Sequence, residues 1–463
     1  MKTFKRFFTV SLLAVFALGI VSCSDDDEGT TPVVEATDIV DIALASSDLS
    51  NLVLALQRAD LVSALEAEGP FTVFAPTNAA FSAFLADNNF ASVDDVPVDV
   101  LTQVLLNHVV SGENLSASLS TGYVSSLSTA GPGGSNLSLF IDTASGVSIN
   151  GVAAVSLPDI EASNGVIHVV DAVIGLPNIV DHALANPDLS SLVDALTANG
   201  NTTFTTLLSD DSQDFTVFAP VNAAFADFTN PNGNELDNIL SNHVLAGTAA
   251  FASGLSNSYV ATAAQNTDGD ALSLYINVDN SVTLNGTSTV AAADIVATNG
   301  VIHAVDAVID IPTVVTFALA DPTFAPLVTA LTTATPGTDF ATILSSETIY
   351  TVFAPTDAAF QALLDSNADW NEVGDIDESL LTSVLLHHVI EGNVRSGDLT
   401  DGINPPTLEG DAITINLPGT GDNIADVTDG AGNTGIGIIA VDVQAGNGVV
   451  HVLDAVLIPD TTN

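Results

Sequence analysis

One short stretch occurs three times in this chain and constrains its fold more than any other feature. It reads NGVIHVVDAVI at 164–174, NGVIHAVDAVI at 299–309 and NGVVHVLDAVL at 447–457. Each copy begins with an Asn-Gly turn signal and continues into β-branched residues, which predicts a strand entered from a tight turn. Both faces of that strand are largely apolar, as in a strand buried inside a domain. A proline follows each copy, so we predict the closing core strand of a unit that is present three times.

The spacing of these copies gives the number of domains. Their histidines, His168, His303 and His451, are separated by domain-sized intervals rather than by the roughly 20–50 residues of a solenoid repeat. We therefore predict three tandem domains. With 47% hydrophobic residues, a chain of 463 residues can fill three ordinary cores.

A second motif also occurs three times and predicts a short strand, a proline stop and a new helix. Its copies are FTVFAPTNAAF (71–81), FTVFAPVNAAF (215–225) and YTVFAPTDAAF (350–360). Thr77 and Thr356 stand where an N-cap hydroxyl would satisfy free N–H groups of the helix, whereas Val221 cannot cap. Asn222 is the candidate replacement, and without one we expect a loss of about 1 kcal/mol.

A third motif ends an apolar helical run. It reads NHVV at 107–110, NHVL at 242–245 and HHVI at 387–390. The order of the three motifs resembles the fasciclin domain family, and the resemblance covers nearly all of residues 37–460. It implies an α+β fold, a β-wedge flanked by helices, in three tandem domains, and a role in extracellular adhesion or matrix binding. We expect the domains at 37–175, 176–311 and 312–460.

The paired residues of the third motif are the candidate partner-binding residues. They match the position where some animal members of the family carry a Tyr-His pair that binds integrin, although the tyrosine is absent from all three copies here. Packing at the helix end is the alternative role. The candidates are Asn107, His108, Asn242, His243, His387 and His388.

The domains are expected to differ on the helical side. Each opens with an amphipathic helix, as in the i, i+3, i+4, i+7 spacing of Leu49, Leu52, Val53 and Leu56, which is typical of a core-facing stripe. The second domain is shorter around 230–235, which predicts the loss of a helical turn or two. The third carries a Gly/Asp-rich insert at 418–437, for which we predict an exposed loop. Linkers are almost absent, so we expect a stiff row.

The net charge excludes some classes of partner. The chain has 56 Asp+Glu and 5 Lys+Arg, a net charge of −51 at pH 7, and beyond the first 22 residues only Arg58 and Arg395 are basic. Such a chain repels nucleic acid and anionic lipid. We expect an extracellular protein or a polysaccharide matrix as partner. The charge itself favours solubility in a salty medium, with binding of divalent cations as the alternative.

The N-terminus is typical of an exported lipoprotein. Residues 1–22 have a basic start and an apolar stretch too short for a comfortable membrane span, which indicates a signal peptide. The stretch ends at IVSC, which resembles a bacterial lipoprotein cleavage site with Cys23 as the lipid-bearing residue; an ordinary buried cysteine is the alternative. Residues 23–36 read as an acidic tether. We expect a lipid-anchored protein of the cell envelope, on the outer membrane and exposed at the surface.

Motifs for catalysis or cofactors are weak. GAGNTG (430–435) matches G-x-G-x-x-G, but a strand is expected after it rather than the helix of a dinucleotide site. His168 and Asp171 point to opposite faces of a strand and cannot form a local dyad, so we expect backbone hydrogen bonds for the histidine. The Asp-rich loops 267–271 and 421–430 are solvated loops or, alternatively, Ca²⁺ ligands. We expect neither an enzyme nor a cofactor or metal ion.

These observations predict an adhesion or matrix-binding module made of three domains on a lipid anchor. A structural spacer that holds a partner away from the membrane is the alternative function.

Overall fold

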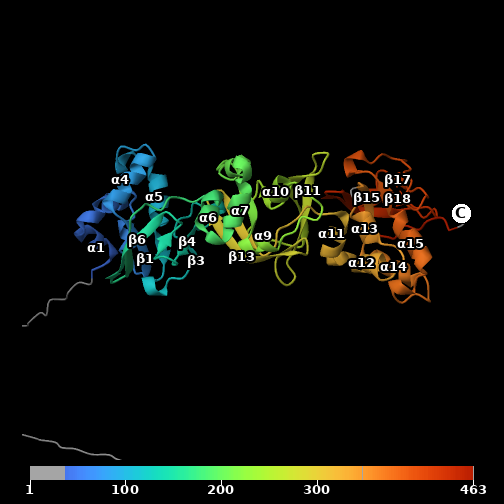
Figure 1. The fold of residues 1–463 in the computed structure, drawn as a ribbon, viewed down its shortest axis with the longest axis horizontal. Coiled ribbons are helices and arrows are strands. Elements are labelled where there is room, and N and C mark those ends of the chain that lie inside the picture. Colours follow the sequence, from blue (N-terminus) through green and yellow to red (C-terminus); the bar gives the residue numbers. More distant parts are fainter. Residues whose placement is uncertain (1–36, 347, 462–463) are drawn as a thin grey trace, which may run out of the picture.

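The computed structural model describes residues 37–346 and 348–461, which form three similar units in a row (Figure 1). We refer to these units as domains 1, 2 and 3, with the boundaries proposed above. The expected signal peptide, Cys23 and the whole tether lie outside the described residues. Within the described ranges no single helix is long and apolar enough to cross a bilayer, and two bent helix pairs meet that criterion by length and composition alone.

Each domain is built on one mixed sheet. The strand order is β2-β1-β7-β6-β5-β4-β3 in domain 1, and domain 2 repeats it as β9-β8-β14-β13-β12-β11-β10. Domain 3 has the shorter order β16-β15-β20-β19-β18-β17. The strands of domain 1 are β1 (Phe71–Pro76), β2 (Val109–Ser111), β3 (Gly122–Ser125), β4 (Ser138–Asp142), β5 (Ser148–Ile149), β6 (Ala153–Ala162) and β7 (Gly165–Val170). Those of domain 2 are β8 (Phe215–Pro220), β9 (Val244–Ala246), β10 (Ser258–Gln265), β11 (Ala271–Asn277), β12 (Thr283–Leu284), β13 (Ser288–Ala297) and β14 (Gly300–Val305). Those of domain 3 are β15 (Tyr350–Pro355), β16 (Val389–Glu391), β17 (Thr414–Asn416), β18 (Ala425–Thr428), β19 (Ile436–Ala445) and β20 (Gly448–Leu453).

The closing strand lies in the middle of each sheet. β7, β14 and β20 pair in parallel with the strand of the second motif and antiparallel with the long strand before them. All but one of their residues are buried, which confirms the predicted core strand. The first strand and the last strand of a domain are therefore direct neighbours.

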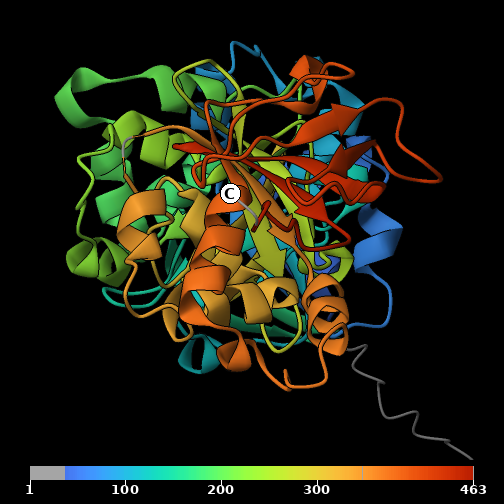
Figure 2. The same cartoon turned by 90° about the vertical axis from the view of Figure 1, so that its right-hand side faces the viewer.

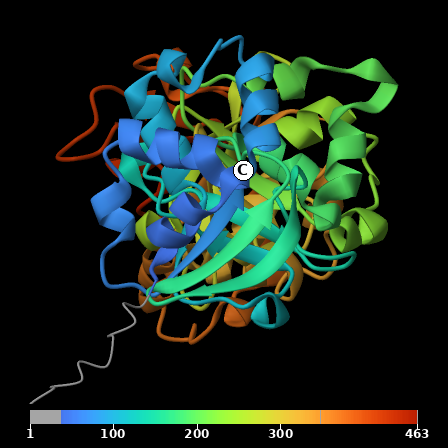
Figure 3. The ribbon, with the colours of Figure 1, turned by 90° about the vertical axis from the view of Figure 1, so that its left-hand side faces the viewer.

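Helices cover one side of each sheet (Figures 2 and 3). Domain 1 has α1 (Ile39–Ala45), α2 (Ser50–Arg58), α3 (Val62–Leu65), α4 (Asn78–Asp87) and α5 (Val98–Leu106). Domain 2 has α6 (Ile179–Ala185), α7 (Ser190–Leu196), α8 (Thr203–Leu207), α9 (Asn222–Asp227) and α10 (Leu236–Ser241). Domain 3 has α11 (Val314–Ala320), α12 (Ala325–Thr332), α13 (Phe340–Leu344), α14 (Asp357–Asp365) and α15 (Glu378–His387). One apolar cluster lies between helices and sheet, and a second lies within the curved sheet.

Most of the predicted stripe is buried: Leu49, Leu52 and Leu56 are all at most 5% exposed, and Val53 is half-buried. A short helix that the pattern did not reveal precedes it in each domain. That helix begins at a capping box, with Asp38, Asn178 or Thr313 as the N-cap.

The Asn-Gly pair of the closing motif joins the end of a domain to its beginning. Asn164 Oδ1 accepts from the amide of Ile39, the first residue of α1, at 3.0 Å, and its amide group donates to Leu65 O at 2.7 Å. Asn299 and Asn447 make the same two kinds of bond in their own domains. Gly165 follows with φ of 150°, and a Cβ there would overlap the Phe71 carbonyl oxygen. Only glycine therefore fits beside the first strand.

The N-caps of the second motif behave as predicted in two domains. Thr77 Oγ1 accepts from Ala80 N and Thr356 Oγ1 from Ala359 N, both at 3.2 Å. Val221 makes no side-chain cap. The candidate replacement, Asn222, is not a cap, because its Oδ1 accepts from the amide of Ser191 on α7.

The helical layer of domain 2 is shortened as expected. α9 has 6 residues, against 10 in α4 and 9 in α14, and α10 has 6 against 9 and 10 in α5 and α15.

The insert of domain 3 is not simply the exposed loop that we predicted. Residues 418–437 contain β18, which pairs with β17 and β19, and Ala425 and Val427 are fully buried. Alternating small and β-branched residues supply a core face that the Gly/Asp content conceals. After GAGNTG (430–435) the chain enters β19, a strand, as predicted.

Candidate functional site

The six candidate partner-binding residues lie in the interior, at the ends of α5, α10 and α15. Their exposed fractions are 0% for Asn107, Asn242 and His387, 2% for His108 and His243, and 3% for His388. The geometry therefore favours the packing role that the sequence left as an alternative.

The second histidine of each pair braces a helix end against the segment after the closing strand. His108 Nδ1 donates to Val104 O at 2.7 Å, and its Nε2 accepts from the amide of Ile174 at 2.9 Å. The same pair of bonds joins His243 to Ile239 and Ile309, and His388 to Val384 and Leu457. An imidazole in this arrangement is neutral, with its proton on Nδ1. Burial lowers the pKa of His108, His243 and His388 to about 4.

The first residue of each pair fastens the segment that leads out of the domain. Asn107 Nδ2 donates to Gly175 O at 2.7 Å, and Asn242 Nδ2 donates to Asp310 O at 3.0 Å. Both acceptors stand just before the next domain begins. The asparagines thus fix the direction in which the chain leaves domains 1 and 2.

His387 replaces this asparagine in domain 3 and holds the insert instead. Its Nε2 accepts from the amide of Gly430 at 3.0 Å, and its Nδ1 lies 3.2 Å from Thr407 Oγ1. Burial lowers the pKa of His387, and the charge of Glu409, whose Oε2 lies 3.7 Å from Nδ1, acts in the opposite direction. The substitution of His for Asn therefore accompanies the insert at 418–437.

A partner could reach these six side chains only after the helix ends open. Contact with a partner through Asn107, His108, Asn242, His243, His387 and His388 thus stays a prediction. The corresponding experiment would compare binding by His243→Gln with that by a surface variant of the same domain.

The histidines of the closing strands also bond to the backbone, as predicted. His168 Nε2 donates to Asn114 O at 2.8 Å, and its Nδ1 accepts from the amide of Asp159 at 3.2 Å. His303 and His451 repeat both bonds. Asp171 is exposed and accepts from the amide of Ala154, so it forms no dyad with His168. Both ring nitrogens are engaged, which leaves none free to transfer a proton.

The carboxylates of the Asp-rich loops order the loops themselves. Asp426 accepts from the amide of Thr420, and Asp429 accepts from the amides of Asn433 and Ile458. In the ranges described above, no group of three or more His, Cys, Asp or Glu side chains is arranged to hold a metal ion.

Comparison with known proteins places these three units in one family. The model of the fasciclin domain matches residues 47–177, 187–312 and 324–459. The chain belongs to the fasciclin domain family.

The relatives differ in how much of the fasciclin chain they share. "Protein sll1483" of Synechocystis sp. is 40% identical over 183 residues, which cover 38% of this chain and 98% of the relative. Transforming growth factor-beta-induced protein ig-h3 of Sus scrofa is 28% identical over 410 residues, 88% of this chain and 55% of that protein. Periostin of Homo sapiens is 26% identical over 451 residues, 92% of this chain and 48% of that protein. The chain thus spans about half the length of ig-h3 and of periostin.

Among solved structures, a fasciclin domain pair from the insect cell adhesion molecule Fasciclin I is similar. It aligns with a TM-score of 0.38 at 18% identity, covering 57% of this chain and 96% of the pair.

The junction between fasciclin domains 1 and 2 is a packed contact. Tyr123 of β3 lies against His182 of α6, with ring centroids 5.6 Å apart, and Ser138 Oγ accepts from the amide of Val296 at 2.9 Å. His182 is fully buried there, and its Nε2 donates to Val296 O at 3.1 Å. Burial raises the pKa of Tyr123 to about 12 and lowers that of His182 to about 4.

The junction between fasciclin domains 2 and 3 repeats this arrangement with equivalent residues. Tyr259 of β10 packs against Phe317 of α11 at 5.5 Å, and Ser273 Oγ accepts from the amide of Gln444 at 2.9 Å. The Tyr259 hydroxyl also donates to Asp321, at 2.9 Å.

An ion pair is added at this second junction. Arg395 Nη1 lies 2.6 Å from Asp270 Oδ1, and its Nη2 lies 3.8 Å from Asp442. The hydrogen bond from Arg395 has the largest effect among the contacts of Asp270 and holds the pKa of that carboxyl below its usual range. One carboxylate of the 267–271 loop is thereby committed to a domain contact rather than to a cation from solution.

Proposed function

We propose that this chain is a surface-anchored adhesion or extracellular-matrix-binding protein that acts through its three fasciclin domains as one stiff row. The observation that carries the proposal is the repeated junction, in which an aromatic pair and a hydrogen bond from a backbone amide to a serine hydroxyl recur between successive domains. Contacts repeated in this way hold the modules at a fixed spacing. We assign the chain no catalytic activity.

A row of fixed spacing suits a repetitive partner. Several weak contacts made together raise avidity by roughly 10²–10⁴ without any new contact. Arg58 and Arg395 are the only basic residues in the described ranges, so the surface is neutral to acidic. The partner is accordingly a neutral or basic extracellular protein or polysaccharide matrix, and nucleic acid is disfavoured.

The test of this function uses an immobilised matrix. The full chain is expected to bind more tightly than the fragments 37–175, 176–311 and 312–460. If one domain alone matches the full chain in affinity, the multivalent mechanism is wrong. If neither the full chain nor any fragment binds cell surfaces or matrix, the spacer function replaces adhesion.

The anchor is a separate part of the proposal. The apolar stretch before IVSC supports lipid attachment at Cys23, with residues 24–36 as tether, in the cell envelope and on the exposed face of the outer membrane. Cys23→Ser should release the protein into the soluble fraction. Identical partition of the variant and the parent into detergent would contradict the anchor.

A further inference from the structure

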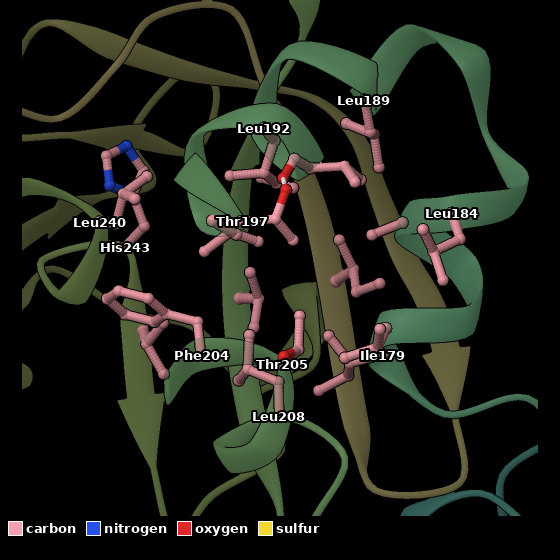
Figure 4. Close-up of a pocket in the computed structure, with 18 of the residues that line it drawn as sticks. Ile179, Leu184, Leu189, Leu192, Thr197, Phe204, Thr205, Leu208, Leu240 and His243 are labelled. Carbon is pink, nitrogen blue, oxygen red and sulfur yellow. Dashed lines mark hydrogen bonds between the residues drawn. The ribbon is translucent and has the colours of Figure 1, made fainter. Parts of the chain in front are cut away.

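Domain 2 contains an apolar cavity of about 310 Å³ between its helices and its sheet (Figure 4). Its walls come from α6, α7, α8, α10, β8 and β14, and include Ile179, Leu192, Phe204, Leu208, Leu240 and His243. The polar side chains among its walls already have partners in the protein: both ring nitrogens of His243 are bonded, and the hydroxyls of Thr197 and Thr205 donate to backbone carbonyls. The interior is therefore suited to a hydrocarbon ligand.

The other two domains have the same cavity at a much smaller size. In domain 3 the equivalent space is divided in two, about 30 Å³ beside Leu327 and His388 and about 70 Å³ beside Val328 and Phe340. In domain 1 it measures about 10 Å³, beside Leu52 and His108. The fold itself does not need a large space here, so the volume is a property of domain 2.

Two local differences accompany the larger volume of domain 2 relative to domain 3. Domain 3 fills the region with Phe317 and Phe324, both at most 2% exposed, whereas domain 2 has His182 and Leu189 at those positions. His182 turns to the junction with domain 1 and is not part of the cavity wall. In addition, α7 has 7 residues against 9 in α2 and 8 in α12.

We propose that this cavity binds an uncharged aliphatic ligand of about a dozen carbons. Ligand sites in proteins begin at roughly 300 Å³, and an apolar cavity of about 150 Å³ takes benzene, so about twice that volume holds roughly twice as many carbons. Residues 176–311 contain no Lys or Arg to accompany a carboxylate or phosphate. The acidic surface would also repel an anionic head, and the cavity wall has no carboxylate to pair with a cationic one.

Exposed members of the wall mark the mouth of the cavity. Leu184 is 64% exposed on α6, and Thr197 is exposed at the end of α7, opposite Thr205 on α8 (Figure 4). Each threonine hydroxyl already donates its proton but can still accept a hydrogen bond. A ligand hydroxyl placed between α7 and α8 would find such an acceptor while its chain lies inside.

The experiment titrates the full chain with 1-decanol, followed by calorimetry and by the melting temperature of the protein. We expect saturable binding of one decanol per chain and a melting temperature that rises with decanol concentration. Decanoate, which has the same chain and a charged head, is expected to bind at least tenfold more weakly. Absence of saturable binding up to the solubility limit of decanol would overturn the proposal, and equal binding of decanoate would overturn its neutral ligand class.

Variants that fill the cavity locate the site. Ala183→Leu and Val193→Phe each add volume to its wall, and each is expected to weaken decanol binding at least tenfold. The matched changes at equivalent positions of domain 3, Ala318→Leu and Val328→Phe, should leave affinity within twofold. Val193 is only half-buried, so this variant serves if Ala183→Leu does not fold. Unchanged binding by the folded domain 2 variants would place the decanol elsewhere and overturn the assignment. Matrix binding plays no part in either readout, so this test and that of adhesion can fail independently.

Discussion

Domains 2 and 3 share one framework and differ in the layer that covers it. In both, a histidine braces the helix end, an asparagine joins the closing strand to the first helix, and the central strands pair in the same register. Above that framework domain 2 has shorter helices and a cavity of about 310 Å³, whereas domain 3 has two phenylalanines and two separate spaces of about 30 and 70 Å³. Polar ties at strand ends thus fix the fold, and the helical layer is free to vary in volume.

The largest effect should come from the glycines that the framework shares. Gly300→Ala and Gly448→Ala each place a Cβ against a backbone carbonyl oxygen of the neighbouring strand, at φ of 153° and 150°. We expect each to lower the free energy of unfolding by about 4 kcal/mol or more. Urea denaturation, with hydrogen exchange read separately for each domain, measures the loss.

The matched controls are Gly254→Ala and Gly397→Ala, whose Cβ atoms would meet nothing within 4 Å. The free energy of unfolding of these two variants should stay within about 0.5 kcal/mol of that of the parent. If domain 2 tolerated Gly300→Ala because its loose helical layer yields, the two domains would not share one rigid framework.

Acid should affect the domains unequally, because domain 2 has two histidines whose pKa falls to about 4 and domain 3 has one, His388, beside His387, whose pKa is also lowered. Burial lowers the pKa of His182 and His243 in domain 2 to about 4. A histidine whose folded pKa lies below 6.5 stabilises the fold fully above pH 6.5, and that contribution is lost as pH falls from 6.5 towards 4. Each of these histidines contributes on the order of 3 kcal/mol to the free energy of unfolding above pH 6.5. We expect domain 2 to lose amide protection in that pH range.

Exchanging one residue between the domains isolates this effect from the protonation of the many carboxylates. His182→Phe introduces the residue that domain 3 has at Phe317, and should remove part of the acid sensitivity of domain 2. Phe317→His should add to the acid sensitivity that His388 already gives domain 3. An equal loss of protection in the parent and in His182→Phe between pH 6.5 and 4 would exclude His182 as a cause.

A smaller effect is expected at the helix after the second motif. Val221→Thr should supply the cap that α9 lacks and stabilise domain 2 by about 1 kcal/mol, while Thr356→Val should cost domain 3 about as much. Thermal unfolding of the two variants beside the parent gives both values. Changes of the same sign in both variants would mean that something other than the cap controls these helices.

The smallest effect belongs to the ion pair that distinguishes the two junctions. Arg395 and Asp270 are partly exposed, so Arg395→Gln should weaken the junction of domains 2 and 3 by about 1 kcal/mol or less, and less still at high salt. Arg58→Gln removes the exposed pair with Asp94 inside domain 1 and is the control. Interdomain distances from spin labels report the change. A larger opening at the junction of domains 1 and 2 would contradict this role.

The sequence predicted the framework because its residues have local physical requirements. Asn-Gly before β-branched residues predicts a strand at a turn, and FTVFAP predicts a strand that stops, so both motifs are correct in all three domains. The predicted end of a helix near His108 is also confirmed, because an apolar helical run is likewise a local pattern. What the pattern could not supply was the environment of that histidine, since its two partners, Val104 and Ile174, belong to different elements.

Features that depend on distant contacts were missed or only half seen. The insert at 418–437 reads as a loop because Gly and Asp dominate it, but β17 and β19 provide neighbours that turn Ala425–Thr428 into a strand. The cavity of domain 2 is likewise invisible in the sequence, because each of its leucines reads as ordinary core. The cavity volume depends on how side chains at equivalent positions differ between domains, and this difference is seen only when the three folded domains are compared.

The asparagine tie also has a consequence for the order of events when the chain is made. Asn164 meets Ile39 across 125 residues, Asn299 meets Ile179 across 120, and Asn447 meets Val314 across 133. The chain is synthesised from its N-terminus, so α1 can form early. Its domain, however, cannot be completed until almost all of its residues have been synthesised. Such long-range closure is slow compared with local helix formation. Each domain therefore matures in a single late step, one after another along the row.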